Sequence, residues 1–215
     1  MQKNILSQFI ARHVREYSSI YLFIMVLFLM GVIFGAIIVN SLSLSQKGDL
    51  FFYLNQFFDQ VAEGKVAQSD DLFRLSFWHN AKYLGLIWIL GISIIGLPII
   101  LILLFLKGIV VGFSVGFLVH QMGWNGFLLA FVAVLPQNLF MIPLFIYMSA
   151  ISVGLSLLII RKIFMKKTFT FPIMPVMMRY LIAFILVIAF VGAAAGLEAY
   201  LSPYMMKSVL QSTAS

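Results

Sequence analysis

The side chains of this sequence that could bind a metal or transfer protons are few and far apart. Only three histidines occur, His13, His79 and His120, and there is no cysteine. No two of these histidines are separated by three or four residues, the spacing that places two zinc ligands on one helix face. His79, His120 and Glu198 could meet at one membrane surface, or the two histidines could make ordinary hydrogen bonds there. Because no Ser-His-Asp order, phosphate loop or carboxylate pair can be assembled either, the sequence predicts no catalytic, cofactor or metal site and no enzyme activity.

A second chemical feature is the stretch LPQNLFMIP at 135–143, which places two amides between two prolines inside a long apolar run. Pro136 removes a backbone donor and should break or kink its helix, with Pro143 close behind. Gln137 and Asn138 could then satisfy the freed carbonyls or bond to a neighbouring helix, because a bilayer offers no water. The alternative is a solute or lipid site at a broken helix, as transporters use. No ionisable residue accompanies the break, which favours packing.

The amino-acid composition indicates that the segments holding these residues lie in a membrane. The chain has 215 residues, of which 63% are hydrophobic and only 10% charged. Its mean hydropathy is +1.08, whereas soluble domains are roughly 45–50% apolar and about 25% charged. We therefore expect an all-α integral membrane protein forming a single membrane domain over residues 1–215.

Apolar segments long enough to cross about 30 Å of hydrocarbon predict five spans. They are 19–40, 83–106, 108–122, 126–160 and 176–199, with a tight turn at GWNG (123–126) and the helix break near Pro136. Both ends of the apolar stretch 108–160 carry cations, so an even number of crossings should lie between them.

Charge predicts the orientation of these spans. One side would hold nine cations against the single anion Glu16: Lys3, Arg12, Arg15, Lys107, Arg161, Lys162, Lys166, Lys167 and Arg179. The other side would hold more acids than bases. Under the positive-inside tendency the N-terminus is cytoplasmic and the C-terminus extracytoplasmic. The net charge of +7 is then an orientation signal and an attraction to anionic lipids, and no nucleic-acid partner is expected.

Two segments outside the spans have helical apolar faces. Residues 1–18 could form an amphipathic helix on the cytoplasmic membrane surface, or simply extend the first span. Residues 41–82 predict a helix with its N-cap at Asp49, and then a second helix that begins near Asp70 and continues into the second span. We interpret this segment as an outer platform for a binding partner, the alternative being that it rests on lipid or on the protein's own helices. Its candidate partner-binding residues are Phe51, Leu54, Phe57, Phe58 and Trp78.

Small residues predict close helix packing. Gly108, Gly112 and Gly116 are four residues apart on one helix face, and Gly192 and Gly196 repeat the spacing in the last span. Such faces let two backbones approach closely. We expect a tightly packed bundle in which the first of these faces contacts the broken helix, and association with further copies of the chain is left open.

Residues 78–143 resemble the stage II sporulation protein M family. The resemblance depends on the spacing of seven residues: Asn80, Gly91, Gly96, Gly108, Gly112, Gly116 and Pro136. Chain length, five spans and the basic RKIFMKK before the last span also agree. After the proline, the broader family often has a His-Gly pair and then a glutamate. Gln137, Asn138 and Met141 occupy these positions here, a departure that resembles the sporulation branch itself.

The resemblance implies a role that composition alone does not show. Proteins of this type are membrane components of engulfment in endospore-forming bacteria, at the septal and engulfing membranes. They are thought to hold two peptidoglycan-degrading partners, stage II sporulation proteins D and P. The expected function is therefore a non-enzymatic scaffold that recruits these hydrolases, and the alternative is a transport component with its site at Pro136 to Asn138.

Overall fold

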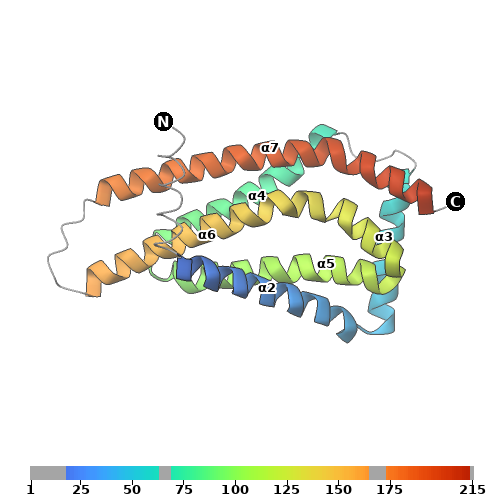
Figure 1. The fold of residues 1–215 in the computed structure, drawn as a ribbon, viewed down its shortest axis with the longest axis horizontal. Helices are drawn as coiled ribbons and strands as arrows, with labels where there is room; N and C mark the ends of the chain where they lie inside the picture. The colour runs from blue at the N-terminus through green and yellow to red at the C-terminus, as the bar shows by residue number, and fades with distance from the viewer. Residues whose placement is uncertain (1–17, 63–68, 165–172, 214–215) are drawn as a thin grey trace.

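Every element that the structure describes is a helix. The computed structural model describes residues 18–62, 69–164 and 173–213, so the expected surface helix in residues 1–18 lies almost wholly outside them. The helices are α2 (Ser18–Ser41), α3 (Leu44–Ala62), α4 (Ser69–Gly91), α5 (Gly96–Ala133), α6 (Leu135–Phe164) and α7 (Ile173–Thr213). Helices α2, α4, α5, α6 and α7 run along a common direction, and α3 lies across one end of their bundle (Figure 1).

The all-α membrane bundle is confirmed, although four rather than five described helices are long and apolar enough to span a membrane. These are Ser18–Ser41, Gly96–Val132, Asn138–Phe164 and Met174–Ala199. Helix α4 packs into the same bundle but is not among them, because Arg74, His79, Asn80 and Lys82 interrupt its apolar sequence. Helix α4 and the four spanning helices each contribute fully buried side chains to one core, among them Ile24, Leu84, Leu104, Phe145 and Val191.

The prediction of one span over 83–106 is wrong. Helix α4 ends at Gly91, a short turn follows, and α5 begins at Gly96. Pro98 lies in the first turn of α5, where a missing backbone donor costs nothing, so it marks the start of a helix rather than an interruption within one. A methyl group on Gly96 would lie 1.8 Å from the Leu90 carbonyl oxygen, so only glycine fits a turn this tight. The helix expected to run from Asp70 through the second span therefore ends at Gly91, after 23 residues.

Side chains of α6 and α7 satisfy the polar groups at this turn. The Ser156 hydroxyl lies 2.9 Å from the Gly91 carbonyl oxygen and 3.1 Å from that of Ser93. The Tyr180 hydroxyl donates to the Trp88 carbonyl at 2.8 Å and also contacts Ser152. In an apolar surrounding each unpaired carbonyl would be costly, so these bonds fix the turn against its neighbours.

The chain reverses direction at Gly123, as the tight turn in GWNG predicted. Gly123 has φ 56° and ψ −126°, a conformation essentially restricted to glycine, and it divides α5 into two limbs. Leu118 on the first limb packs against Leu129 and Ala130 on the second. The chain then continues into α6 with Pro136 in the first turn of that helix, so the helix break expected near Pro136 is found at Val134.

The glycine face of α5 packs against α2, the most extensive helix contact in the bundle. A methyl group on Gly112 would lie 1.9 Å from the Val32 carbonyl oxygen, and one on Gly108 would lie 2.5 Å from that of Phe28. Gly31 and Gly35 of α2 approach α5 equally closely. The partner of this face is thus the first span rather than the broken helix, and the two helices meet backbone to backbone.

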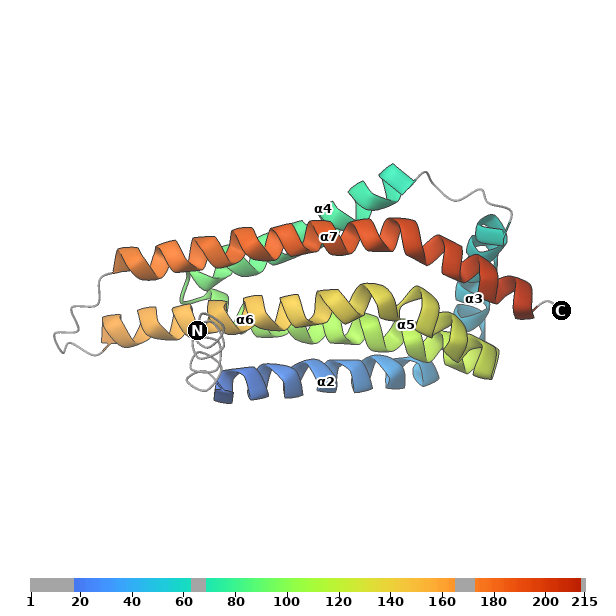
Figure 2. The ribbon, with the colours of Figure 1, turned by 45° about the horizontal axis from the view of Figure 1, so that its top comes forward.

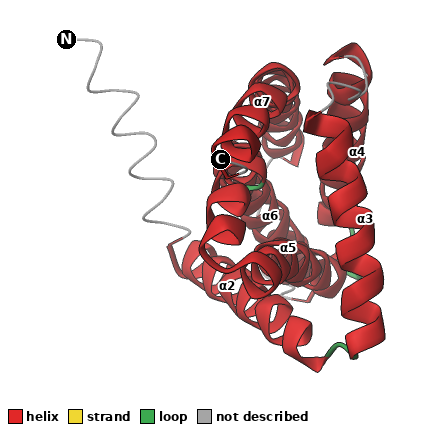
Figure 3. Ribbon diagram, turned by 90° about the vertical axis from the view of Figure 1, so that its right-hand side faces the viewer, coloured by secondary structure: helices red, strands yellow, loops and turns green. Residues whose placement is uncertain are grey.

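Helix α3 begins five residues before the expected N-cap at Asp49. The Ser43 amide donates to the Gln46 side-chain oxygen at 3.0 Å, and the Gln46 amide donates to the Ser43 hydroxyl at 3.3 Å. This reciprocal pair is a capping box with glutamine in the acidic position. Helix α3 lies at one end of the bundle and roughly perpendicular to the long helices (Figure 2). Viewed from that end, it runs along one side of α2, α5, α6 and α7 (Figure 3). The second predicted start is accurate, since α4 begins at Ser69 with Asp70 and Asp71 in its first turn.

Candidate functional site

The outward side of α3 carries an exposed aromatic surface, which we define as Phe52, Tyr53 and Phe57. Phe52 and Tyr53 are 65% and 67% exposed, and their rings contact edge to face at 5.9 Å between centroids. Phe57 is 45% exposed. Exposed aromatic patches of this kind mark surfaces that contact another protein or a membrane.

The five residues predicted for partner binding do not lie together on one surface. Leu54 turns inward and packs against the cluster formed by Leu118 and Leu129 at the α5 reversal. Phe51 is half-buried, and the side chain of Phe58 lies outside the described part of the chain. Trp78 is exposed but belongs to α4. Among the predicted residues whose side chains are described, only Phe57 therefore contributes to the α3 aromatic surface.

At the helix break, the side chain of Asn138 hydrogen-bonds to a backbone carbonyl of its own chain segment. Its side-chain amide donates to the Val134 carbonyl at 2.8 Å, and its backbone amide reaches the same oxygen at 3.2 Å. The side chains of Pro136 and Gln137 lie outside the described set, and Pro143 is inside α6. Both contacts go to the Val134 carbonyl, whereas the carbonyl that Pro136 deprives of its helical donor is that of Val132, four residues earlier.

A cation lies inside the bundle. Lys107 was expected at the cytoplasmic end of a span, but α5 begins at Gly96, so Lys107 is about 16 Å along that helix from its start. Its ammonium nitrogen lies 4.9 Å from the centroid of the Phe145 ring and 5.9 Å from that of Tyr83. These two rings meet edge to face at 5.4 Å. The ammonium is thus held by aromatic faces, a favourable arrangement where water is scarce.

Polar groups of α4 and α7 complete a layer around Lys107. The Ser76 hydroxyl donates to a carboxylate oxygen of Glu198, and Glu198 attracts the Lys107 ammonium electrostatically. Asn80 is 1% exposed and donates to the Ser76 carbonyl at 2.9 Å. We call Ser76, Asn80, Tyr83, Lys107 and Glu198 the polar layer. Charged groups within a membrane bundle are costly and are retained where they pair or serve a function.

The histidines considered as metal ligands are separated in the structure. His120 Nε2 lies 3.2 Å from the Lys47 ammonium, which joins α5 to α3. His79 lies on α4 beside Lys82, and Glu198 belongs to the polar layer. Over residues 18–62, 69–164 and 173–213, no three metal-ligating side chains come close enough to hold an ion. His13 lies outside these ranges.

The two glycines of the last span have little close packing. A methyl group on Gly192 would make ordinary contact with the Phe77 ring at 3.7 Å, and one on Gly196 would meet nothing within 4 Å. Sequence reasoning also missed Lys107 as an interior residue and the pair Phe52 and Tyr53. If Pro98 had been interpreted as a proline in the first turn of a helix, the predicted helix would have started near it, and Lys107 would have been placed in the helix interior.

A bundle of long apolar helices with one short helix across its end defines a multi-pass, all-α integral membrane protein. The chain belongs to the stage II sporulation protein M family, whose model matches residues 24–203. The resemblance found in the sequence is thereby confirmed, and the protein is a sporulation-related membrane protein. No curated protein and no solved structure matches the chain.

Proposed function

We propose that the protein is a non-enzymatic scaffold that recruits and localises peptidoglycan-degrading enzymes at the septal membrane during engulfment. Its partners would be stage II sporulation proteins D and P. Family membership supplies the sporulation context. The observation that supports a scaffold is the α3 aromatic surface at one end of the bundle, where soluble parts of a partner could reach it.

Charge supports an orientation in which this end faces the cell wall. Among described residues, Arg161 and Lys162 end α6, and Arg179 follows in the first turns of α7, at the end of the bundle opposite α3. Asp49 and Asp59 lie on α3 itself. Cations collect on the cytoplasmic side of membrane proteins, which would leave α3 outside.

Capture of the hydrolases tests the scaffold. We expect the triple variant Phe52→Ala, Tyr53→Ala, Phe57→Ala to lose at least about tenfold of its co-purification with proteins D and P, because exposed aromatic anchors carry most of the energy of an interface. The measurement is pull-down from solubilised membranes with quantified partner bands. Phe190→Ala is the matched control, since Phe190 is 63% exposed on the membrane-spanning part of α7. Undiminished capture by the triple variant would exclude α3 as the docking surface.

Accessibility labelling tests the orientation separately. The chain has no cysteine, so Gln56→Cys on the exposed side of α3 introduces a single thiol. We expect a membrane-impermeant maleimide added to intact, wall-stripped cells to label this variant. An Arg161→Cys variant should react only after the cells are opened. Labelling in the reverse order would place α3 in the cytoplasm, where wall-degrading enzymes could not meet it.

A further inference from the structure

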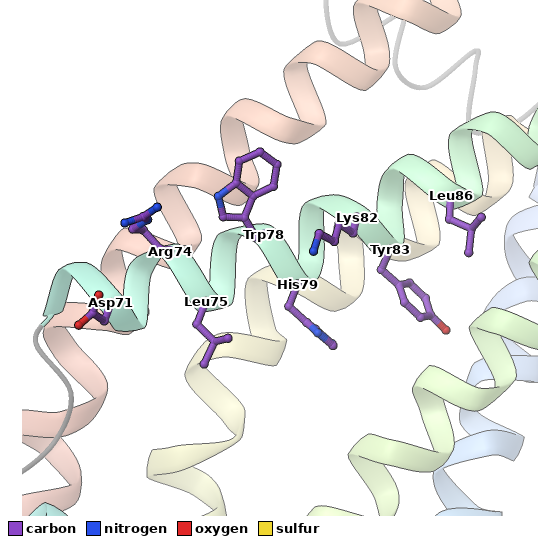
Figure 4. Close-up of a pocket in the computed structure, with 8 residues that line it drawn as sticks. All are labelled: Asp71, Arg74, Leu75, Trp78, His79, Lys82, Tyr83 and Leu86. Carbon is purple, nitrogen blue, oxygen red and sulfur yellow. The ribbon is translucent and has the colours of Figure 1, made fainter.

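Helix α4 carries a groove that the scaffold role does not use. The cavity measures about 630 Å³, and eight residues between Asp71 and Leu86 line it. Arg74 and Trp78 project to one side of α4, Lys82 lies along the helix beside them, and Leu75, His79, Tyr83 and Leu86 project to the other side (Figure 4). The groove therefore follows the bundle from the α3 end into the region of the polar layer.

Charge in this groove is predominantly positive. Arg74 and Lys82 are both exposed, and Asp71 is the one carboxylate in the lining. Within the described residues, neither cation makes an ion pair with an acid. Arg74 and Lys82 are about two turns, roughly 12 Å, apart along α4. Their side chains are long enough to converge on a phosphate between them, which a guanidinium group binds in a bidentate manner.

The remaining lining is suited to an amphipathic ligand. Trp78 is 56% exposed between the two cations, and tryptophan is favoured at the level of lipid headgroups. Leu75 and Leu86 are 72% and 44% exposed in the same groove. Because the bilayer is the solvent around α4, the abundant molecule with a phosphate next to an apolar chain is a phospholipid.

We propose that this groove is a binding site for an anionic phospholipid. Arg74 and Lys82 bind the headgroup phosphate, Trp78 packs beside it, and an acyl chain lies against Leu75, Tyr83 and Leu86. A zwitterionic lipid has the same phosphate but adds a cation next to it, which the two basic side chains repel. The site therefore selects lipid by net charge.

Trp78 itself reports occupancy. Purified full-length protein is reconstituted in phosphatidylcholine vesicles that contain either brominated phosphatidylglycerol or brominated phosphatidylcholine, since bromine quenches nearby tryptophan fluorescence. The fluorescence due to Trp78 is the difference between the signals of the wild type and of Trp78→Phe, because Trp88 and Trp124 are present in both. We expect phosphatidylglycerol to quench this fluorescence at lower mole fraction than phosphatidylcholine.

Charge variants identify the site. In the double variant Arg74→Gln, Lys82→Gln, the apparent affinity for phosphatidylglycerol should fall by about tenfold or more. Each basic residue near a membrane contributes about 1 kcal/mol of attraction to anionic lipid. Lys162→Gln removes a cation at the opposite end and should keep the wild-type preference. Both altered side chains are exposed, so the double variant should elute as the wild type does. Equal quenching by the two lipids, an unchanged double variant, or an equal loss in Lys162→Gln would each overturn the proposal.

Discussion

Replacing Gly112 by leucine is expected to prevent the bundle from forming. A single methyl group at this position would already lie 1.9 Å from the Val32 carbonyl oxygen and 2.6 Å from its carbon. These are backbone atoms of α2, so no side chain can rotate away, and the two helices must separate. Separation would remove the largest helix contact of the molecule. We expect loss of the monodisperse species in size-exclusion chromatography after detergent extraction.

A matched series separates steric conflict from loss of glycine. Gly112→Ala should lower the free energy of unfolding in detergent by about 1–3 kcal/mol, the usual range for overpacking. Gly196→Ala adds the same methyl group where nothing lies within 4 Å. There it should be neutral or stabilise by up to about 1 kcal/mol, because alanine favours helix over glycine. Equal behaviour of the two alanine variants would contradict the close α2–α5 contact.

The glycine interface also shows what the sequence could and could not predict. The four-residue spacing of Gly108, Gly112 and Gly116 identified the packed face, because helical periodicity places these residues on one side. It did not identify the neighbour, since periodicity contains no information on which helix lies opposite. Gly31 and Gly35 have the same spacing in the first span. Matching complementary glycine pairs between spans would have pointed to α2.

The boundaries of helices were less predictable than their existence. An uninterrupted apolar run conceals a turn at residues 92–95, because in a membrane the residues of a turn can themselves be apolar. The exposed fractions of Ile92, Ile94 and Ile95 reach 74%, and hydropathy cannot distinguish them from helix. Glycines at both ends and Pro98 just beyond were the available signals. This error placed Lys107 at a membrane surface and hid the polar layer.

On α3 the sequence predicted an aromatic helix but not its outward side. The expected apolar face consisted of six residues at helical spacing: Leu50, Phe51, Leu54, Phe57, Phe58 and Val61. Leu54 indeed packs inward against the α5 reversal, whereas Phe57 is exposed. Phe52 and Tyr53, which are left exposed, lie between the residues of this face in the sequence but on other sides of the helix. In a soluble protein an apolar face is buried and the opposite face is polar. Here both sides carry large apolar groups, so only tertiary contacts show which is covered.

The polar layer leads to the second large expected effect, a coupling between Lys107 and Glu198. Glu198→Gln keeps a side-chain oxygen for the Ser76 hydroxyl but removes the negative charge that attracts the Lys107 ammonium. The ammonium would then face the rings of Tyr83 and Phe145 without its acid. Both side chains are only partly buried, so we expect the loss in the free energy of unfolding to be about 1–3 kcal/mol, the usual cost of leaving a buried polar group without its partner.

A double-mutant cycle isolates this interaction from other effects of each change. Lys107→Met retains an apolar side chain of similar length, and in Lys107→Met, Glu198→Gln neither charge is left unpartnered. We expect the double variant to be more stable in detergent than the two single losses predict, with a coupling energy of about 0.5–3 kcal/mol. Lys162→Met, at the far end of α6, should leave the effect of Glu198→Gln unchanged. Strict additivity of Lys107→Met and Glu198→Gln would mean that the cation is held by the aromatic rings alone, and that the layer does not join α5 to α7 through charge.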